Sequence, residues 1–122
     1  GNILLFDNGP HRGGATFSRI VEVNPRTDKI EWQYQGDPSI SFYSFHISGA
    51  ERQPNGNTLV TEGAPGRVFE VTAEGEIVWE FVNPHRIPGA VMGSGTATSI
   101  FRAHRYSADH PAFKNRNLTP ET

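Results

Sequence analysis

The chain has 122 residues, which is enough for one ordinary domain. Hydrophobic residues make up 35% of it and charged residues 20%, a balance that is typical of a globular protein rather than a disordered one. The net charge of −2 gives no electrostatic argument for binding nucleic acid or an anionic membrane, and the absence of cysteine excludes disulfides and thiolate metal sites. No apolar run approaches the roughly 18 residues of a membrane-spanning helix.

Turn-forming residues are frequent, and apolar residues alternate with polar ones between the turns. The 13 glycines and 9 prolines favour many short strands. Asn55-Gly56 is a two-residue hairpin signal, because both residues tolerate positive φ. The sequence therefore predicts an all-β fold. In chain order, the expected strands are 2–6, 18–23, 29–35, 44–53, 57–62, 67–72, 76–82 and 98–106.

The chain opens on Gly1 and enters an apolar strand at once, which favours an internal or C-terminal piece of a longer protein, or a processed product.

Part of the sequence occurs twice. The stretch "GNILLFDNG" (1–9) matches "GNTLVTEG" (56–63), and "SRIVEVNPRTDKIEWQY" (18–34) matches "GRVFEVTAEGEIVWEF" (66–81). The offset between the copies falls from 55 residues at the first match to 47 at Trp32 and Trp79, largely because the first copy has a longer loop. A period in this range is that of a four-stranded β-propeller blade.

The two copies are cut out of phase. The first copy, 1–36, lacks its innermost strand, and 42–83 has all four. After a glycine-rich stretch at 89–95, the segment 96–107 resembles an innermost, blade-closing strand with no blade behind it, and 108–122 is expected to be an irregular tail.

Residues that match between the copies are expected to play structural parts. Trp32 and Trp79 alternate with apolar neighbours, so we expect both in the blade core. Arg19 and Arg67 are expected to pair with the matching glutamates, Glu22 and Glu70.

Three stretches carry a family resemblance: "FDNG…R", "SGAERQPNGNTLVTEG…GRVFEVTAEGEIVWEFVNP" and "FRAHRYSADHPAFKNRNLTP". The chain resembles the C-terminal part of arylsulfotransferase-like propellers, over nearly all of its length but over only about a third of such a protein. The resemblance implies a six-bladed propeller with an active site in its central funnel and no cofactor. Characterised members are periplasmic and move a sulfuryl group between phenols through a sulfated histidine, without a nucleotide donor.

The resemblance also points to particular residues. "FDNGPHRG" is similar to the family stretch whose arginine contacts the sulfuryl group, which implies Arg12 with Asp7 and Asn8 shaping its loop. The family's nucleophilic histidine falls at Arg52 in "SGAERQ", which is a departure, and His46 is the nearest histidine before it. The candidate anion-binding residues are Asp7, Asn8, His11, Arg12, Arg52 and Glu62, and the candidate catalytic residue is His46.

Each candidate has an alternative structural role. Arg12 and His11 fit a solvated loop, and His46 fits a hydrogen-bonded core histidine. Arg52 fits a pair with Glu51, with Glu62 or with a neighbouring blade. Asp7 and Glu62 end equivalent strands, where carboxylates commonly form turns. The spacing of the histidines predicts no metal site.

Three classes of function remain open from the sequence. The first is an arylsulfotransferase-like enzyme, the second a propeller funnel that binds a small anion such as an aryl sulfate, and the third a structural or interaction propeller. Two blades alone leave unpaired strand edges, which favour self-association. We expect a cyclic homotrimer of six blades, in which 98–106 of each chain completes the blade of 2–35 in the next.

Overall fold

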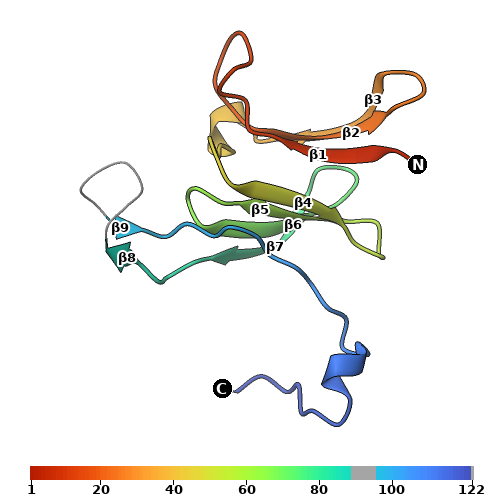
Figure 1. Ribbon diagram of the computed structural model, residues 1–122, viewed down its shortest axis with the longest axis vertical. Helices are drawn as coiled ribbons and strands as arrows, with labels where there is room; N and C mark the ends of the chain where they lie inside the picture. The colour runs from red at the N-terminus through yellow and green to blue at the C-terminus, as the bar shows by residue number, and fades with distance from the viewer. Residues whose placement is uncertain (89–95, 122) are drawn as a thin grey trace.

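The computed structural model describes residues 1–88 and 96–121, and it is all-β, as the sequence predicts (Figure 1). Its strands form two antiparallel sheets. The first sheet has the order β1-β2-β3 and the second has the order β4-β5-β6-β7. The first comprises β1 (Ile3–Asp7), β2 (Arg19–Asn24) and β3 (Lys29–Gln35); the second comprises β4 (Ser48–Arg52), β5 (Thr58–Glu62), β6 (Arg67–Val71) and β7 (Ile77–Val82).

The remaining elements are short. There are two single 3₁₀ turns, η1 (Ser39–Ser41) and η2 (Pro111–Phe113). A separate antiparallel pair consists of two strands of two residues each, β8 (Ile87–Pro88) and β9 (Thr96–Ala97). The expected glycine-rich stretch at 89–95 and the last residue of the tail lie outside the described residues. No helix within the described ranges is long and apolar enough to cross a membrane. The tail extends away from both sheets in Figure 1.

The repeat found in the sequence is also present in the structure. Asp7 lies opposite Arg19 in the first sheet, and Glu62 lies opposite Arg67 in the second. The register between the last two strands of each sheet shifts at the same place, directly after Glu22 and its match Glu70. The first sheet therefore corresponds to β5-β6-β7, and the strand it lacks is the counterpart of β4.

The two sheets stack face to face, and their facing side chains form the core (Figure 1). Phe42, from the connection between the sheets, is 1% exposed. Its ring meets Phe6 of the first sheet at 5.3 Å and Phe69 of the second at 5.5 Å, both edge to face. Such aromatic pairs add about 0.5–1.5 kcal/mol to the burial of their surface. The core residues are Ile20, Tyr34, Phe42, Val60, Phe69 and Val71, with Leu4, Phe6, Trp32 and Ala50 packed against them.

Each sheet also has an outer face, directed away from the other sheet. On the outer face of the first sheet, Ile3 and Leu5 are 48% and 46% exposed. On the second, Trp79 and Phe81 are 44% and 43% exposed. The expectation that both tryptophans lie in the core therefore holds for Trp32 and is wrong for Trp79 in the single chain, because only the first has a sheet packed over it.

The predicted strand at 98–106 is wrong. These residues are extended but pair with no strand; the strand that precedes them in the sequence, β9, ends at Ala97. They run along the outer face of the second sheet, where the amide of Ile100 donates to the carbonyl of Gly63 at 2.9 Å and the amide of Ala103 donates to Thr61 Oγ1 at 3.1 Å. A strand needs an open sheet edge beside it, and this face offers side chains instead.

The predicted strand at 44–53 is shorter in the structure, because 44–47 form a loop. Ser44 Oγ donates towards the carbonyls of His46 and Ile47 and accepts the amide of Ala64, which folds the loop on itself. The close approach requires glycine at position 63, where a Cβ atom would lie 2.4 Å from the carbonyl oxygen of Ile47. The loop therefore sits tightly against the end of β5.

Candidate functional site

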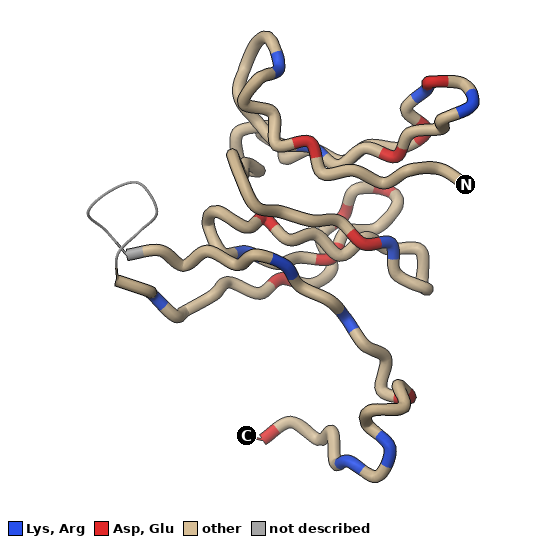
Figure 2. The backbone as a smooth tube through the Cα atoms, viewed as in Figure 1, with Lys and Arg blue, Asp and Glu red and all other residues tan. Residues whose placement is uncertain are grey.

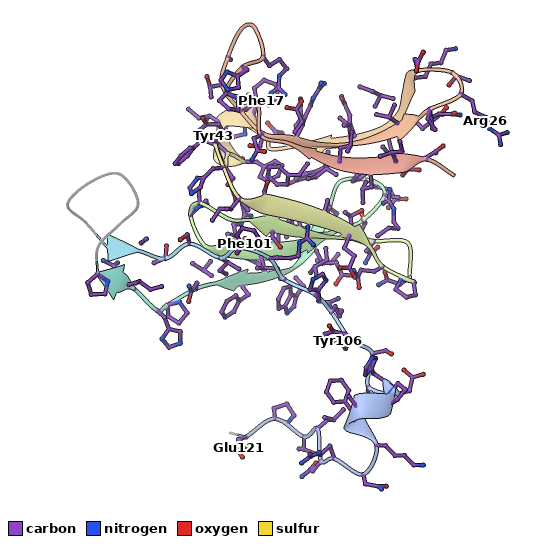
Figure 3. The ribbon with its side chains drawn as sticks, in the orientation of Figure 1. Phe17, Arg26, Tyr43, Phe101, Tyr106 and Glu121 are labelled. Atoms are coloured by element: carbon purple, nitrogen blue, oxygen red, sulfur yellow. The ribbon has the colours of Figure 1, made fainter. Side chains whose placement is uncertain are left out.

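A hollow of about 640 Å³ opens where β1 ends and the 44–47 loop begins. We call it the Asp7 hollow. Figure 3 shows Phe17 and Tyr43 near this end of the stacked sheets, with Arg26 far away at the other end of the first sheet. The lining residues are Phe6, Asp7, Asn8, Gly9, Pro10, His11, Arg12, Arg19 and Phe45.

Two arginines converge on one carboxylate in this hollow. Arg12 and Arg19 both donate to Asp7 Oδ2, and the Arg19 contact is 2.8 Å. Arg12 also donates to the carbonyl of Phe17 at 2.5 Å and lies 4.4 Å over the Phe17 ring. Partial burial alone would raise the pKa of Asp7, but the hydrogen bonds and charges of the two arginines outweigh it and lower that pKa. The cluster therefore carries a net charge of about +1 at neutral pH.

Asn8 and His11 play different parts beside this cluster. Asn8 Nδ2 donates to the Ser44 carbonyl at 2.7 Å and to Ser48 Oγ at 3.0 Å, which ties the end of β1 to the next sheet. His11 is exposed on the rim of the hollow. Asn8 thus positions the wall of the hollow, while His11 forms part of its exposed rim.

His46 lies just behind the hollow. Its ring stacks on Phe45 with 4.1 Å between the centroids, and its Nδ1 atom is buried without a hydrogen-bond partner in the described part of the chain. The following residue, Ile47, has a φ of +37°, which is strained for a β-branched side chain. Phe45, not His46, contributes the exposed wall.

Glu62 is the counterpart of Asp7 but is enclosed. It accepts the amide of Tyr43 at 2.7 Å and a contact from Arg67 at 3.3 Å, and its side chain is only 5% exposed. Burial raises the pKa of Glu62 above its ordinary value, against the lowering effect of these two donors. It does not line the hollow.

Arg52 lies at the far end of β4, away from the hollow. It pairs with Glu22 of the first sheet, donates to Thr58 Oγ1 at 2.6 Å, and lies 4.7 Å over the Trp32 ring. The structure therefore brings Asp7, Asn8, His11 and Arg12 together and leaves Arg52 in a contact between the sheets, one of the alternatives open from the sequence.

The same contact occurs a second time. Arg105 pairs with Glu70 of the second sheet and lies 5.1 Å over the Trp79 ring. We call the two sets the Arg–Glu–Trp contacts. Sequence reasoning missed Arg105, although "GAER" (49–52) and "RAHR" (102–105) carry the signal at an offset of 53 residues.

The two glutamates of these contacts behave alike. A hydrogen bond from Asn2 and then the contact with Arg52 lower the pKa of Glu22, while Asn57, Asn55 and Arg105 lower that of Glu70. The expected pairing of these glutamates with Arg19 and Arg67 is wrong. Residues three apart on a strand point to opposite faces, so neither arginine can reach the glutamate on its own strand.

Figure 2 shows that Lys and Arg as well as Asp and Glu occur along both sheets. Within residues 1–88 and 96–121, no three His, Asp or Glu side chains gather as metal ligands. No family model, curated protein or solved structure matches the chain.

Proposed function

We propose that the two sheets are consecutive β-propeller blades and that the protein acts as an assembly unit that closes into a ring. The recurrence of the Arg–Glu–Trp contact carries this proposal. Arg52 fastens the second sheet to the first, and Arg105 fastens the next segment of chain to the second sheet in the same way. Each contact is a place where one repeat receives the innermost strand of the following repeat.

The exposed outer faces support the same proposal. Ile3, Leu5, Trp79 and Phe81 are all more than two-fifths exposed, and their counterparts between the sheets include the fully buried Val60. Apolar faces of this kind favour association. Three copies would supply the six blades that the resemblance to arylsulfotransferase-like propellers implies, so the proposed state is a cyclic trimer.

Size-exclusion chromatography with light scattering tests the assembly. A trimer of 13.5 kDa chains has a mass of about 40 kDa. Phe81→Glu, which puts a charge on the outer face of the second sheet, is expected to give monomers. Val82→Glu is the matched control, because Val82 is 57% exposed on the same strand but, next to Phe81 in the regular part of the strand, points to the other face. A stable 13.5 kDa monomer of the unaltered protein would refute the assembly.

We further propose that the Asp7 hollow binds a small aromatic anion, for which an aryl sulfate is the probe. Arg12 and Arg19 supply planar, charged donors, and Phe45, which is 50% exposed, supplies a surface for the ring. One carboxylate between two guanidiniums leaves donor capacity for a second anion. The resemblance adds sulfuryl transfer as the reaction to test, with His46 as its candidate nucleophile.

Calorimetry with 4-nitrophenyl sulfate, compared with 4-nitrophenol, tests the binding. Arg19→Gln should weaken sulfate ester binding about 10- to 150-fold, since a charged hydrogen bond is worth about 1.5–3 kcal/mol. Arg26→Gln, at the distant end of the first sheet (Figure 3), should leave it unchanged. Intact mass after incubation with the ester distinguishes the two roles: an added SO₃ group that His46→Ala abolishes indicates transfer, and binding without an adduct indicates a binding module.

A further inference from the structure

We infer that the free edge of β1 is a strand-docking site and that its occupant is the segment 101–105 of a second copy of this chain. The inference rests on the proposed assembly and specifies which strand joins which edge, and in what register.

The first observation is the difference between β1 and its counterpart. β5 is paired on both sides, with β4 and with β6. β1 is paired only with β2, so its other edge has no strand beside it among the described residues. An edge of exposed backbone N–H and C=O groups is a template for another strand.

The second observation is that 101–105 has the characteristics of β4. Ala103 and Arg105 match Ala50 and Arg52 in sequence. Both segments lie on the preceding sheet in the same way, since each places its arginine on the glutamate of the middle strand and over the tryptophan of the outer strand. They differ in one respect: β4 has a neighbour, β5, to pair with, and 101–105 has none in its own chain within the described ranges.

The third observation is that a single docking step would pair the free edge of β1 and also cover the exposed outer face of the second sheet. If 101–105 pairs with β1 of a second copy as β4 pairs with β5, the first sheet of that copy is placed over the outer face that holds Trp79 and Phe81. Its Ile3 and Leu5 then take the places that Thr58 and Val60, both 0% exposed, take between the two sheets. Neither copy has to refold, because 101–105 is already extended on that face (Figure 1).

The internal pairing fixes the register. Ala50 lies opposite Val60, and Arg52 lies opposite Thr58. By the repeat, Ala103 of one copy lies opposite Leu5 of the next, and Arg105 lies opposite Ile3. Directly opposite residues on antiparallel strands have Cα atoms about 4.5–5.5 Å apart, which is within the range that a disulfide spans.

Disulfide trapping between copies tests this register. The chain has no cysteine of its own, so two single variants, Leu5→Cys and Ala103→Cys, can be mixed and oxidised. We expect a covalent pair of chains on a non-reducing gel. Leu4→Cys mixed with Ala103→Cys is the slipped control and should give at least tenfold less product, because a shift of one residue points the side chains to opposite faces. The double variant Ala50→Cys/Val60→Cys, within one chain, shows that the same geometry permits a disulfide.

The outcomes separate the inference from the proposal on which it rests. Efficient trapping of the Leu5 and Ala103 variants supports both. If the variants keep the mass of the trimer but Leu4→Cys forms a disulfide with Ala103→Cys as efficiently as Leu5→Cys does, or more so, the strand register is overturned and the ring proposal stands. A monomer under all conditions overturns both. Light scattering of each single variant before mixing shows whether the substitution has itself prevented folding or assembly. For such a variant the neighbouring pair Leu4→Cys and His104→Cys, the counterparts of Leu59 and Glu51, repeats the test and leaves Arg105 in place.

Discussion

The two sheets of this protein are built from matching sequence, yet their matching residues have different surroundings. Trp32 is covered by the second sheet and donates to the carbonyl of Ala73 at 2.8 Å, whereas Trp79 is 44% exposed. Asp7 is held by two arginines at the edge of a hollow and has a lowered pKa, whereas Glu62 is enclosed and has a raised pKa. In a repeat of this kind, the neighbour decides the environment of a residue as much as the residue's own sequence does.

The core between the sheets gives the largest expected effect. Phe42 contacts aromatic rings of both sheets and is 1% exposed, so Phe42→Ala should lower the free energy of unfolding by about 3–5 kcal/mol. Urea melts measure it. A loss below about 1 kcal/mol would mean that the two sheets do not share a core.

The matched tryptophans give the next effect. Trp32→Ala should cost about 3 kcal/mol, because it removes a covered ring and its hydrogen bond to Ala73. Trp79→Ala should cost about 1 kcal/mol in dilute protein, because its ring is already partly in water. The comparison is made by urea melts at several protein concentrations. If the chains assemble, the difference in lost stability between the two variants should become smaller as protein concentration rises. Equal losses in dilute protein would contradict the claim that only Trp32 has a sheet packed over it.

The lowered pKa of Glu70 predicts a pH-dependent contribution to stability. A folded-state pKa below the unfolded value contributes stability at neutral pH that is lost as pH falls through the folded pKa. Glu70→Gln should therefore cost about 1.5–3 kcal/mol at pH 7, and the cost should shrink as the pH falls from the ordinary glutamate pKa through the lowered folded pKa. Thermal melts across this range measure it, and a cost that does not change with pH would show that the carboxylate charge is not what holds Arg105.

Glu62 is expected to show a smaller effect of the opposite sign. Its folded pKa is raised, so its favourable contribution is present below the unfolded pKa and is lost as pH rises through the folded pKa. As the pH rises from about 4 to 7, the stability of Glu62→Gln should increase relative to that of the unaltered protein. This increase should be smaller than the change with pH in the cost of Glu70→Gln. The same melts compare the two variants, and a parallel trend would indicate that Glu62 is stabilised by Arg67 rather than penalised by burial.

Much of the fold was predictable because strand alternation and turn residues are local signals. The seven strands of the two sheets lie where they were expected, with ends that differ by at most one residue except at 44–47. That loop was missed because its apolar sequence, "SFHI", is strand-like, while the Ser44 hydrogen bonds and the positive φ of Ile47 that shape it depend on β5.

The candidate site was predictable only in part, for a related reason. Asp7, Asn8, His11 and Arg12 are close in sequence and share a loop, so the structure brings them together. Arg52 was assigned to the same site from its place in the chain, but the ends of β4 are far enough apart for Ser48 to contact Asn8 while Arg52 contacts Glu22. Its partner is set by the stacking of the sheets, which no spacing in the sequence encodes.

The most direct test of the account uses Trp79 as a reporter of the outer face of the second sheet. In a Trp32→Phe variant it is the only tryptophan, because the chain has two. If a second copy covers this face as the second sheet covers Trp32, its fluorescence emission should shift to shorter wavelength as protein concentration rises, in step with the mass from light scattering, and Phe81→Glu should remove the shift. Emission that stays that of a partly solvated indole at all concentrations would contradict the claim that this face is an incomplete repeat interface.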